Sequence, residues 1–341
     1  DLEWKDISTR GMAAIGKTFG PSQTLKKLNL SRNERIKDEG VIAMCNNASS
    51  RCRELGLAYY SFPVLQELNL ADCGIGGGMG MESLVELLGN FGGNVNSRSL
   101  SLVLRGNSLG LEACVALASL LCDSPQVSSL SVSNCGIGNA EMSILCAAVG
   151  MQSCNGVTLL DLSSNNIGKD GATSLSSSLA KWTSLKDLRL AGNAILQGGV
   201  EALMNQLVVS DCALKSLDLS QTSCGAQGAS AAVKCIKLTS LRLFNNKLGS
   251  DGFETLVPLL KGGHASLVNL DLCGNDASEE AVVRLLNSIA DAADFKSKLR
   301  VLEIGGNSGG EGVEEAIKRV KQVHPGLDIA RDKPKGETVS R

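Results

Sequence analysis

The chain has 341 residues, of which 43% are hydrophobic and 3% aromatic, and its formal net charge is −2. This balance argues against a nucleic-acid-binding protein, which usually carries a basic stripe, and against a polybasic membrane binder. No apolar run approaches the roughly 18–20 residues of a spanning helix, so we expect no nucleic-acid partner and no membrane insertion.

Ten copies of one pattern occupy residues 25–312, and residues 1–24 precede them. The first 24 residues contain Leu2, Trp4 and Phe19 around a stretch of small and apolar residues. The end of a stack of repeats exposes a core that needs covering. We therefore expect residues 1–24 to form an N-terminal cap or a partial repeat.

The clearest copy of the pattern spans residues 157–168. Leu160 and Leu162 are two residues apart, so on an extended strand both face a core, while Asp161 between them faces outward. Asn165 follows at the turn, where its amide can bond buried backbone groups, and Ile167 returns to the core. The copy therefore predicts a short strand, a buried asparagine and a return to the interior.

The other copies repeat these offsets. The predicted strands are residues 25–30, 65–70, 99–104, 127–132, 157–162, 185–190, 214–219, 238–243, 267–272 and 299–304. The turn residues that follow them are Asn33, Cys73, Asn107, Cys135, Asn165, Asn193, Thr222, Asn246, Asn275 and Asn307. Differences between successive turn positions are 40, 34, 28, 30, 28, 29, 24, 29 and 32 residues, which leaves room for a helix in each repeat.

The predicted helices show apolar spacings of three and four residues. Ala172, Leu175 and Leu179 share one helical face, and later repeats show the same spacing. Strand, turn and helix repeated ten times predict an α/β horseshoe solenoid. Its parallel sheet would lie on the concave face and its helices on the convex face, because helices are wider than the spacing between strands.

Two repeats are longer than the rest. The first surplus segment, residues 45–63, includes Tyr59, Tyr60 and Phe62, which are three of the ten aromatic residues. Insertions in repeats map to loops, often on the binding side, so these three residues are candidates for protein binding. The alternative is that they cover the first repeats, with Trp4 and Phe19 beneath them.

The chain closes with three features. A helix and a short strand over residues 313–330 are expected to form a C-terminal cap. Residues 331–341, which include Lys333, Pro334 and Lys335, are expected to be a disordered tail.

The twelve cysteines are predicted to be reduced. Cys73 and Cys135 occupy the turn position held elsewhere by asparagine, and others lie among apolar residues in predicted helices. No CxxC pair occurs, so we expect no zinc site. We also expect no other metal and no cofactor. Reduced thiols favour a cytoplasmic location.

Residues 25–309 resemble the ribonuclease-inhibitor-like class of leucine-rich repeats. That class includes ribonuclease inhibitor, the Ran GTPase-activating protein, the sensor regions of NOD-like receptors, and cytoskeletal and flagellar repeat proteins. The resemblance implies the horseshoe fold. It does not imply one function, because these relatives share an architecture and carry out different tasks.

The sequence offers no catalytic constellation and no expected small-molecule substrate. Its two histidines, His264 and His324, fall in different repeats. One alternative rests on resemblance: Asn245 and Asn246 lie in a stretch similar to an Asn-Asn repeat of the Ran GTPase-activating family, and Arg242 would be the nearby arginine. Asn246 is also the ordinary turn residue of its repeat.

The predicted concave face carries the remaining binding candidates. In the column between the two core positions, the candidates are Asp161, Arg189, Asp218, Arg242, Asp271 and Glu303. Their signs alternate from Asp161 to Asp271, so neighbouring side chains can pair with one another. The next outward column is mostly small, and Phe244 is its one large apolar residue.

We therefore expect a non-enzymatic protein-binding scaffold or assembly subunit that binds one or more proteins. A cytoskeletal or flagellar assembly is one possible setting. The alternatives are a GTPase-activating protein of the Ran type and the repeat region of an innate-immunity sensor.

Overall fold

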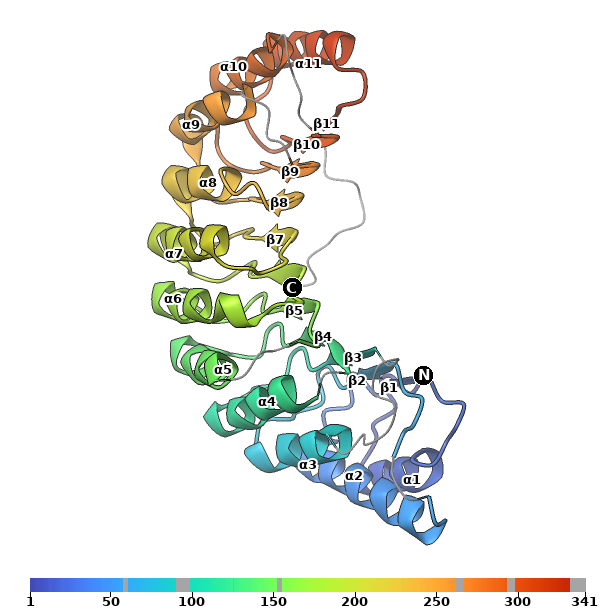
Figure 1. Ribbon diagram of the computed structural model, residues 1–341. Coiled ribbons are helices and arrows are strands. Elements are labelled where there is room, and N and C mark those ends of the chain that lie inside the picture. The colour runs from blue at the N-terminus through green and yellow to red at the C-terminus, as the bar shows by residue number, and fades with distance from the viewer. Residues whose placement is uncertain are drawn as a thin grey trace. The chain divides into compact units, whose positions relative to one another are not determined.

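The computed structural model describes residues 1–57, 61–89, 99–124, 126–151, 155–261, 266–292 and 298–331. Along these residues, eleven strands alternate with eleven α-helices (Figure 1). The chain divides into two compact units, which are described separately. Within the described residues, no helix is long and apolar enough to cross a membrane.

Unit 1 comprises Asp1–Ile167, Ser177–Lys186 and Asp211–Ala213. Its strands pair in parallel and in chain order, with the helices along one side of the strands (Figure 1). The strands are β1 (Lys27–Asn29), β2 (Glu67–Asn69), β3 (Leu100–Val103), β4 (Val127–Ser131) and β5 (Leu159–Asp161). The helices are α1 (Thr9–Phe19), α2 (Lys37–Glu54), α3 (Gly78–Gly89), α4 (Leu111–Asp123) and α5 (Asn139–Met151), and the short 3₁₀ helix η2 spans Leu179–Lys181.

Unit 2 comprises Gly168–Ser176, Asp187–Ser210 and Leu214–Arg341, and it has the same parallel order. Its strands are β6 (Asp187–Arg189), β7 (Ser216–Asp218), β8 (Ser240–Arg242), β9 (Asn269–Asp271), β10 (Val301–Glu303) and β11 (Asp328–Ala330). Its helices are α6 (Lys169–Ser178), whose last two residues belong to unit 1, α7 (Leu196–Val209), α8 (Gly225–Val233), α9 (Gly249–Lys261), α10 (Glu279–Ala290) and α11 (Glu311–Val323).

The predicted alternation of inward and outward residues is confirmed. Leu160, Leu162 and Ile167 are at most 3% exposed, whereas Asp161 between the two leucines is partly exposed. All ten predicted strands form, each shorter than the predicted six residues, and β11 lies where the closing strand was expected. The repeating leucines therefore build the core between the strands and the helices.

A ladder of buried turn side chains connects successive repeats, and Asn165 shows how. Its Nδ2 donates to the carbonyl of Val132 at 2.9 Å and to that of Leu162 at 2.9 Å. Its Oδ1 accepts the backbone N–H groups of Cys135 at 2.9 Å and Ile137 at 3.0 Å. One amide thus satisfies backbone groups in its own repeat and in the preceding one, where no water is available to do so.

Cysteine and threonine serve at other positions of the ladder. Cys73 Sγ lies 3.2 Å from the Leu30 carbonyl and Cys135 Sγ lies 3.3 Å from the Leu104 carbonyl, so both thiols can donate to the carbonyls that asparagine would bond. Thr222 Oγ1 donates to Leu219 O at 2.8 Å. These side chains have neither the NH₂ group with its two donors nor the amide oxygen. They therefore replace only part of the asparagine function.

The residue before each ladder position has a left-handed backbone, which the sequence analysis did not predict. All ten repeats show a φ between 53° and 74° at this turn. The residues are Arg32, Asp72, Gly106, Asn134, Ser164, Gly192, Gln221, Asn245, Gly274 and Gly306. Left-handed backbone lets the chain leave the strand sharply, at a cost of about 1–2 kcal/mol where the residue is not glycine.

The predicted insertion at residues 45–63 is corrected in part. Residues 45–54 continue helix α2, which has 18 residues, and they do not form a loop. The helix continues because Cys45, Ala48 and Cys52 face the core. The long spacing of this repeat is thus largely helix.

Candidate protein-binding face

Strand register in unit 2 brings five candidate side chains into one row across the sheet. Arg189 pairs with Asp218, Asp218 with Arg242, Arg242 with Asp271, and Asp271 with Glu303. Each residue is the outward one between two buried core residues, as its repeat pattern requires. The row therefore combines two basic and three acidic side chains on one sheet face.

Ion pairs within this face balance much of its charge. Arg242 Nη1 lies 3.7 Å from Asp218 Oδ2, and Arg189 Nη2 lies 3.1 Å from Asp187 Oδ2 on its own strand. The Arg242 side chain remains 47% exposed, so solvent screens its pair, which is worth about 0–1 kcal/mol. The predicted cross-strand pairing is confirmed for Asp218 and Arg242.

The aspartates of the row also hold the backbone. Asp218 Oδ1 accepts the Ser220 N–H at 2.9 Å, and Asp271 Oδ1 accepts the Cys273 N–H at 2.9 Å. Each carboxylate thus satisfies a donor two residues ahead, where the strand ends. The sequence analysis missed this role, although the recurring Asp or Asn two residues before a small residue was a visible signal.

Phe244 is the large apolar side chain of the second column. It is partly exposed, and its ring lies over the next repeat, because an ideal Cβ on Gly274 would be 3.0 Å from Phe244 Cε2. The neighbouring column residues Ser220, Cys273 and Gly305 are buried and small. Phe244 therefore offers a contact area beside the exposed guanidinium of Arg242.

An acidic group closes the row at its far end. Ligand atoms of Asp271, Cys273 and Glu303 lie within 4.8 Å of one another, and these are residue types that can bind a metal ion. Burial, together with the nearby Asp271 and Glu303 charges, raises the pKa of the Cys273 thiol to about 12. The thiol is therefore protonated at neutral pH, so the group is not poised as a thiolate ligand.

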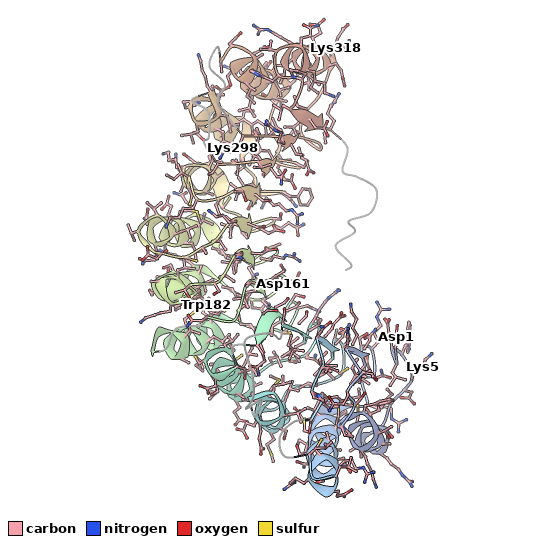
Figure 2. All side chains as sticks on the ribbon, turned by 45° about the vertical axis from the view of Figure 1, so that its right-hand side comes forward. Asp1, Lys5, Asp161, Trp182, Lys298 and Lys318 are labelled. Carbon is pink, nitrogen blue, oxygen red and sulfur yellow. The ribbon has the colours of Figure 1, made fainter. Side chains whose placement is uncertain are left out.

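Unit 1 contains the other candidates. Asp161 lies on the strand side, where its Oδ1 accepts the Ser163 N–H at 3.0 Å and its Oδ2 lies 3.3 Å from Ser131 Oγ (Figure 2). Tyr59 and Tyr60 lie outside the described residues. Phe62 is only 2% exposed, which favours a covering role for this residue over a place in a binding surface.

Trp4 is not buried, although the covering alternative placed it beneath the aromatic segment. The Trp4 side chain is 75% exposed, and the Arg32 guanidinium lies 5.8 Å from the centre of its ring. Trp4 therefore stacks with a cation at the surface instead of lying beneath the aromatic segment. Phe19 is 38% exposed, so it is not buried there either.

Asn246, which the sequence raised, and the glycine-rich turn Gly74–Gly77 before α3 both have structural roles. Asn246 is fully buried: its Nδ2 donates to Leu219 O at 2.7 Å, and its Oδ1 accepts the Thr222 N–H at 3.0 Å. Its amide is thus used within the ladder, whereas the neighbouring Asn245 is exposed. The glycine-rich loop before α3 gives its Gly77 N–H to Asp38 Oδ2 at 2.9 Å, so this chain's own carboxylate occupies it.

Eleven of the twelve cysteines lie in the described residues, and all are free thiols. Ten of them are buried. Burial raises the pKa of Cys45, Cys114, Cys135 and Cys224 to about 12, and that of Cys73 and Cys146 to about 11. They behave as small core residues. Cys154 lies outside the described residues.

The fold and its ladder define a leucine-rich repeat solenoid. The family described as Leucine Rich repeat matches residues 22–45, 63–84, 153–176 and 234–257. The chain is a leucine-rich repeat protein of the ribonuclease-inhibitor-like class, to whose members it is distantly related. The expected family and fold class are thereby confirmed.

Two curated relatives show how distant the relationship is. The chain is 27% identical over 337 residues to the ribonuclease inhibitor of Mus musculus, covering 88% of this chain and 68% of that protein. It is 28% identical over 285 residues to the NACHT, LRR and PYD domains-containing protein 3 of Macaca mulatta. That alignment covers 77% of this chain and 27% of the longer protein, so the chain spans about a quarter of it.

A solved structure is similar as well. The leucine-rich repeat-containing protein LegL7 from Legionella pneumophila matches with a TM-score of 0.48 and 17% identity. The match covers 93% of this chain and 96% of that one.

Proposed function

We propose that the chain is a non-enzymatic protein-binding repeat that uses the sheet face of unit 2. The observation that carries this proposal is the row from Arg189 to Glu303 with Phe244 beside Arg242. An exposed arginine next to a large aromatic side chain is a combination that concentrates binding energy at interfaces. The ion-paired charges around them contribute selectivity more than affinity.

The type of relative supports the same proposal. One relative is named a ribonuclease inhibitor, and a protein of that name acts on another protein. Because unit 2 presents both signs of charge, we expect a partner surface that is also mixed in charge, with an apolar site for Phe244. The proposal includes no cofactor and no small-molecule substrate.

The alternative functions have less support. A GTPase activator of the Ran type would use an asparagine near Arg242; Asn246 is buried within the ladder, and of the Asn245–Asn246 pair Asn245 alone is exposed. The similarity to NACHT, LRR and PYD domains-containing proteins keeps a sensor region open as a second candidate. The relatives reported above give no support to a flagellar or cytoskeletal setting, and cytoplasmic location remains part of the proposal.

The proposal can be tested with a double variant, Arg242→Ala with Phe244→Ala. Its matched control changes an exposed arginine and an exposed apolar residue on the helical side of unit 2, Arg284→Ala with Val208→Ala. Proteins captured from a lysate by each variant are quantified by mass spectrometry, and thermal melts verify folding. We expect the sheet-face variant alone to lose specific partners at least tenfold. Equal capture by both variants contradicts the proposal.

A further inference from the structure

The last repeat of unit 2 contains a pocket of about 360 Å³. It lies beside β10 and the start of α11, and its wall includes Ile304, Asn307, Ser308, Glu314 and Arg331. This volume is within the range of sites that bind small groups. Its lining is mixed, because it combines backbone, an ion pair and apolar side chains.

The pocket exists because two residues of the last repeat, Gly309 and Arg331, depart from the repeat pattern. Two residues after the ladder position, eight of the nine preceding repeats place a buried side chain: Ile75, Leu109, Ile137, Ile167, Ile195, Cys224, Leu248 and Ala277. The first repeat has the exposed Arg35 there. Gly309 occupies that position in the last repeat and has no side chain. The Arg331 guanidinium reaches the space beside Gly309 and forms an ion pair with Glu314. A polar space therefore replaces the apolar core of the other repeats.

The pocket also contains two backbone donors whose counterparts are both satisfied by a ladder amide in four other repeats. The N–H groups at the ladder position and two residues beyond it are accepted by the next ladder Oδ1: Cys73 and Ile75 by Asn107, Cys135 and Ile137 by Asn165, Thr222 and Cys224 by Asn246, and Asn275 and Ala277 by Asn307. The distances are 2.9–3.2 Å. The corresponding donors of Asn307 and Gly309 have no acceptor among the residues that the structure describes.

The pocket also contains a carbonyl acceptor at a position that the ladder repeats. Each ladder amide also donates its Nδ2 to a carbonyl of the preceding repeat, as Asn275 does to Leu243 O at 2.9 Å and Asn307 to Leu272 O at 3.0 Å. The equivalent carbonyl in the pocket is that of Ile304, which lines the wall. Within the described part of the chain it accepts only the Nδ2 of its own Asn307, at 2.8 Å, whereas Leu272 O accepts from both Asn275 and Asn307. Two N–H donors and one carbonyl acceptor thus lie where the ladder would hold one more amide.

We propose that this pocket binds the side-chain amide of an asparagine presented by a partner protein. The amide oxygen accepts from Asn307 and Gly309, and the amide nitrogen donates to Ile304. A carboxylate lacks the donor, and the pocket's one guanidinium is already paired with Glu314. Residues 332–341 contain neither asparagine nor glutamine, so that segment has no such side chain to offer. This site is independent of the sheet face proposed above.

The test uses a short peptide that copies the repeat turn, acetyl-Gly-Gly-Asn-Ser-Gly-amide, with Asp and Ala replacing Asn in two matched peptides. Binding is followed by the amide NMR signals of Asn307 and Gly309 in the ¹⁵N-labelled full chain. We expect saturable shifts of these two signals with the Asn peptide. The Asp and Ala peptides should bind at least tenfold more weakly.

A pocket-filling variant supplies the protein-side control. Gly309→Ile restores the side chain of the other repeats and should abolish the shifts, whereas Gly326→Ala, where an added Cβ meets nothing within 4 Å, should leave them unchanged. Thermal melts verify that both variants fold. Absence of shifts with the Asn peptide, or equal affinity for the three peptides, overturns the proposal. So does binding that requires removal of residues 332–341, because this chain would then occupy its own pocket.

Discussion

At the scale of single residues, one side-chain amide forms hydrogen bonds with several buried backbone groups. The Asn165 side chain serves four backbone groups at 2.9–3.0 Å, one in its own repeat and three in the preceding repeat. Asn166, next in the sequence, is exposed. Asn165 therefore contributes more to the free energy of unfolding than Asn166, because only Asn165 faces the core.

Replacing Asn165 with alanine should lower the free energy of unfolding by about 3 kcal/mol, since buried N–H and C=O groups lose their partners. Asn166→Ala should change it by less than about 0.5 kcal/mol. Urea unfolding followed by circular dichroism measures both. Similar losses in the two variants would mean that the ladder amide contributes no more than a surface side chain.

The outward direction of Asp161 alone would predict almost no loss of stability on its replacement, but its hydrogen bond to the backbone predicts a moderate one. Its carboxylate accepts the Ser163 N–H, and that group is only partly exposed. We expect Asp161→Ala to cost about 1 kcal/mol, because a side-chain cap is lost but water can replace it. A loss as large as that of Asn165→Ala, in the same urea titrations, would contradict the assignment of inward and outward positions.

At the scale of elements, the turn between strand and ladder carries backbone strain. Ser164 has a φ of 55° and Gly192 has a φ of 70° at the equivalent position. The repeats tolerate aspartate, arginine or serine there because the asparagine that follows fixes the turn with several hydrogen bonds. The strain is thus offset by the ladder, and glycine removes it.

Ser164→Gly should therefore raise the free energy of unfolding by about 0.5–1 kcal/mol, since glycine adopts a positive φ without a steric cost. The same change inside helix α6, Ser174→Gly, should lower it by about 0.5 kcal/mol, because glycine disfavours a helix. Thermal melts of the two variants should shift in opposite directions. Destabilisation by both changes would indicate that the turn is not strained.

Sequence patterns predicted those features that depend on a repeated residue type. The strands follow from paired leucines and the ladder from recurring asparagine. The left-handed backbone before each ladder residue was not predicted, because its residues, from Arg32 to Gly306, share a backbone angle and no side-chain chemistry. The length of α2 escaped because its many polar residues obscured the buried face of Cys45, Ala48 and Cys52. Arg242, Phe244 and the alternating column were found from the sequence, but the hydrogen bonds that Asp218 and Asp271 accept from the backbone two residues ahead needed the structure.

At the scale of the whole molecule, the cores of both units contain thiols. Burial raises the pKa of seven described cysteines to about 11 or 12, from an ordinary value of 9.0. Below pH 9 these thiols are protonated in both the folded and the unfolded chain. Between pH 9 and about 12 the unfolded chain releases protons that the folded chain keeps, so stability falls as pH rises.

Unfolding free energy should consequently be nearly independent of these thiols up to pH 8 and fall steeply above pH 9, by as much as about 1.4 kcal/mol per thiol and pH unit. Urea titrations at pH 8 and pH 10 under reducing conditions measure the fall. Cys45→Ala removes one such thiol and should reduce the difference between the two pH values. An unchanged difference in that variant would show that Cys45 ionises alike in both states.

The ladder has a consequence for how such a chain can change length over evolutionary time. The distance from the last core residue of each strand to the ladder residue is always three positions, while the distance between successive ladder residues ranges from 24 to 40. Gene duplication or deletion of one complete period leaves every amide opposite the same two N–H groups. An insertion of a single codon between strand and ladder would instead disconnect two neighbouring repeats at once. Mutation can therefore lengthen or shorten the stack by whole periods, and can vary the helices freely, while the four residues at each strand end tolerate no change in number.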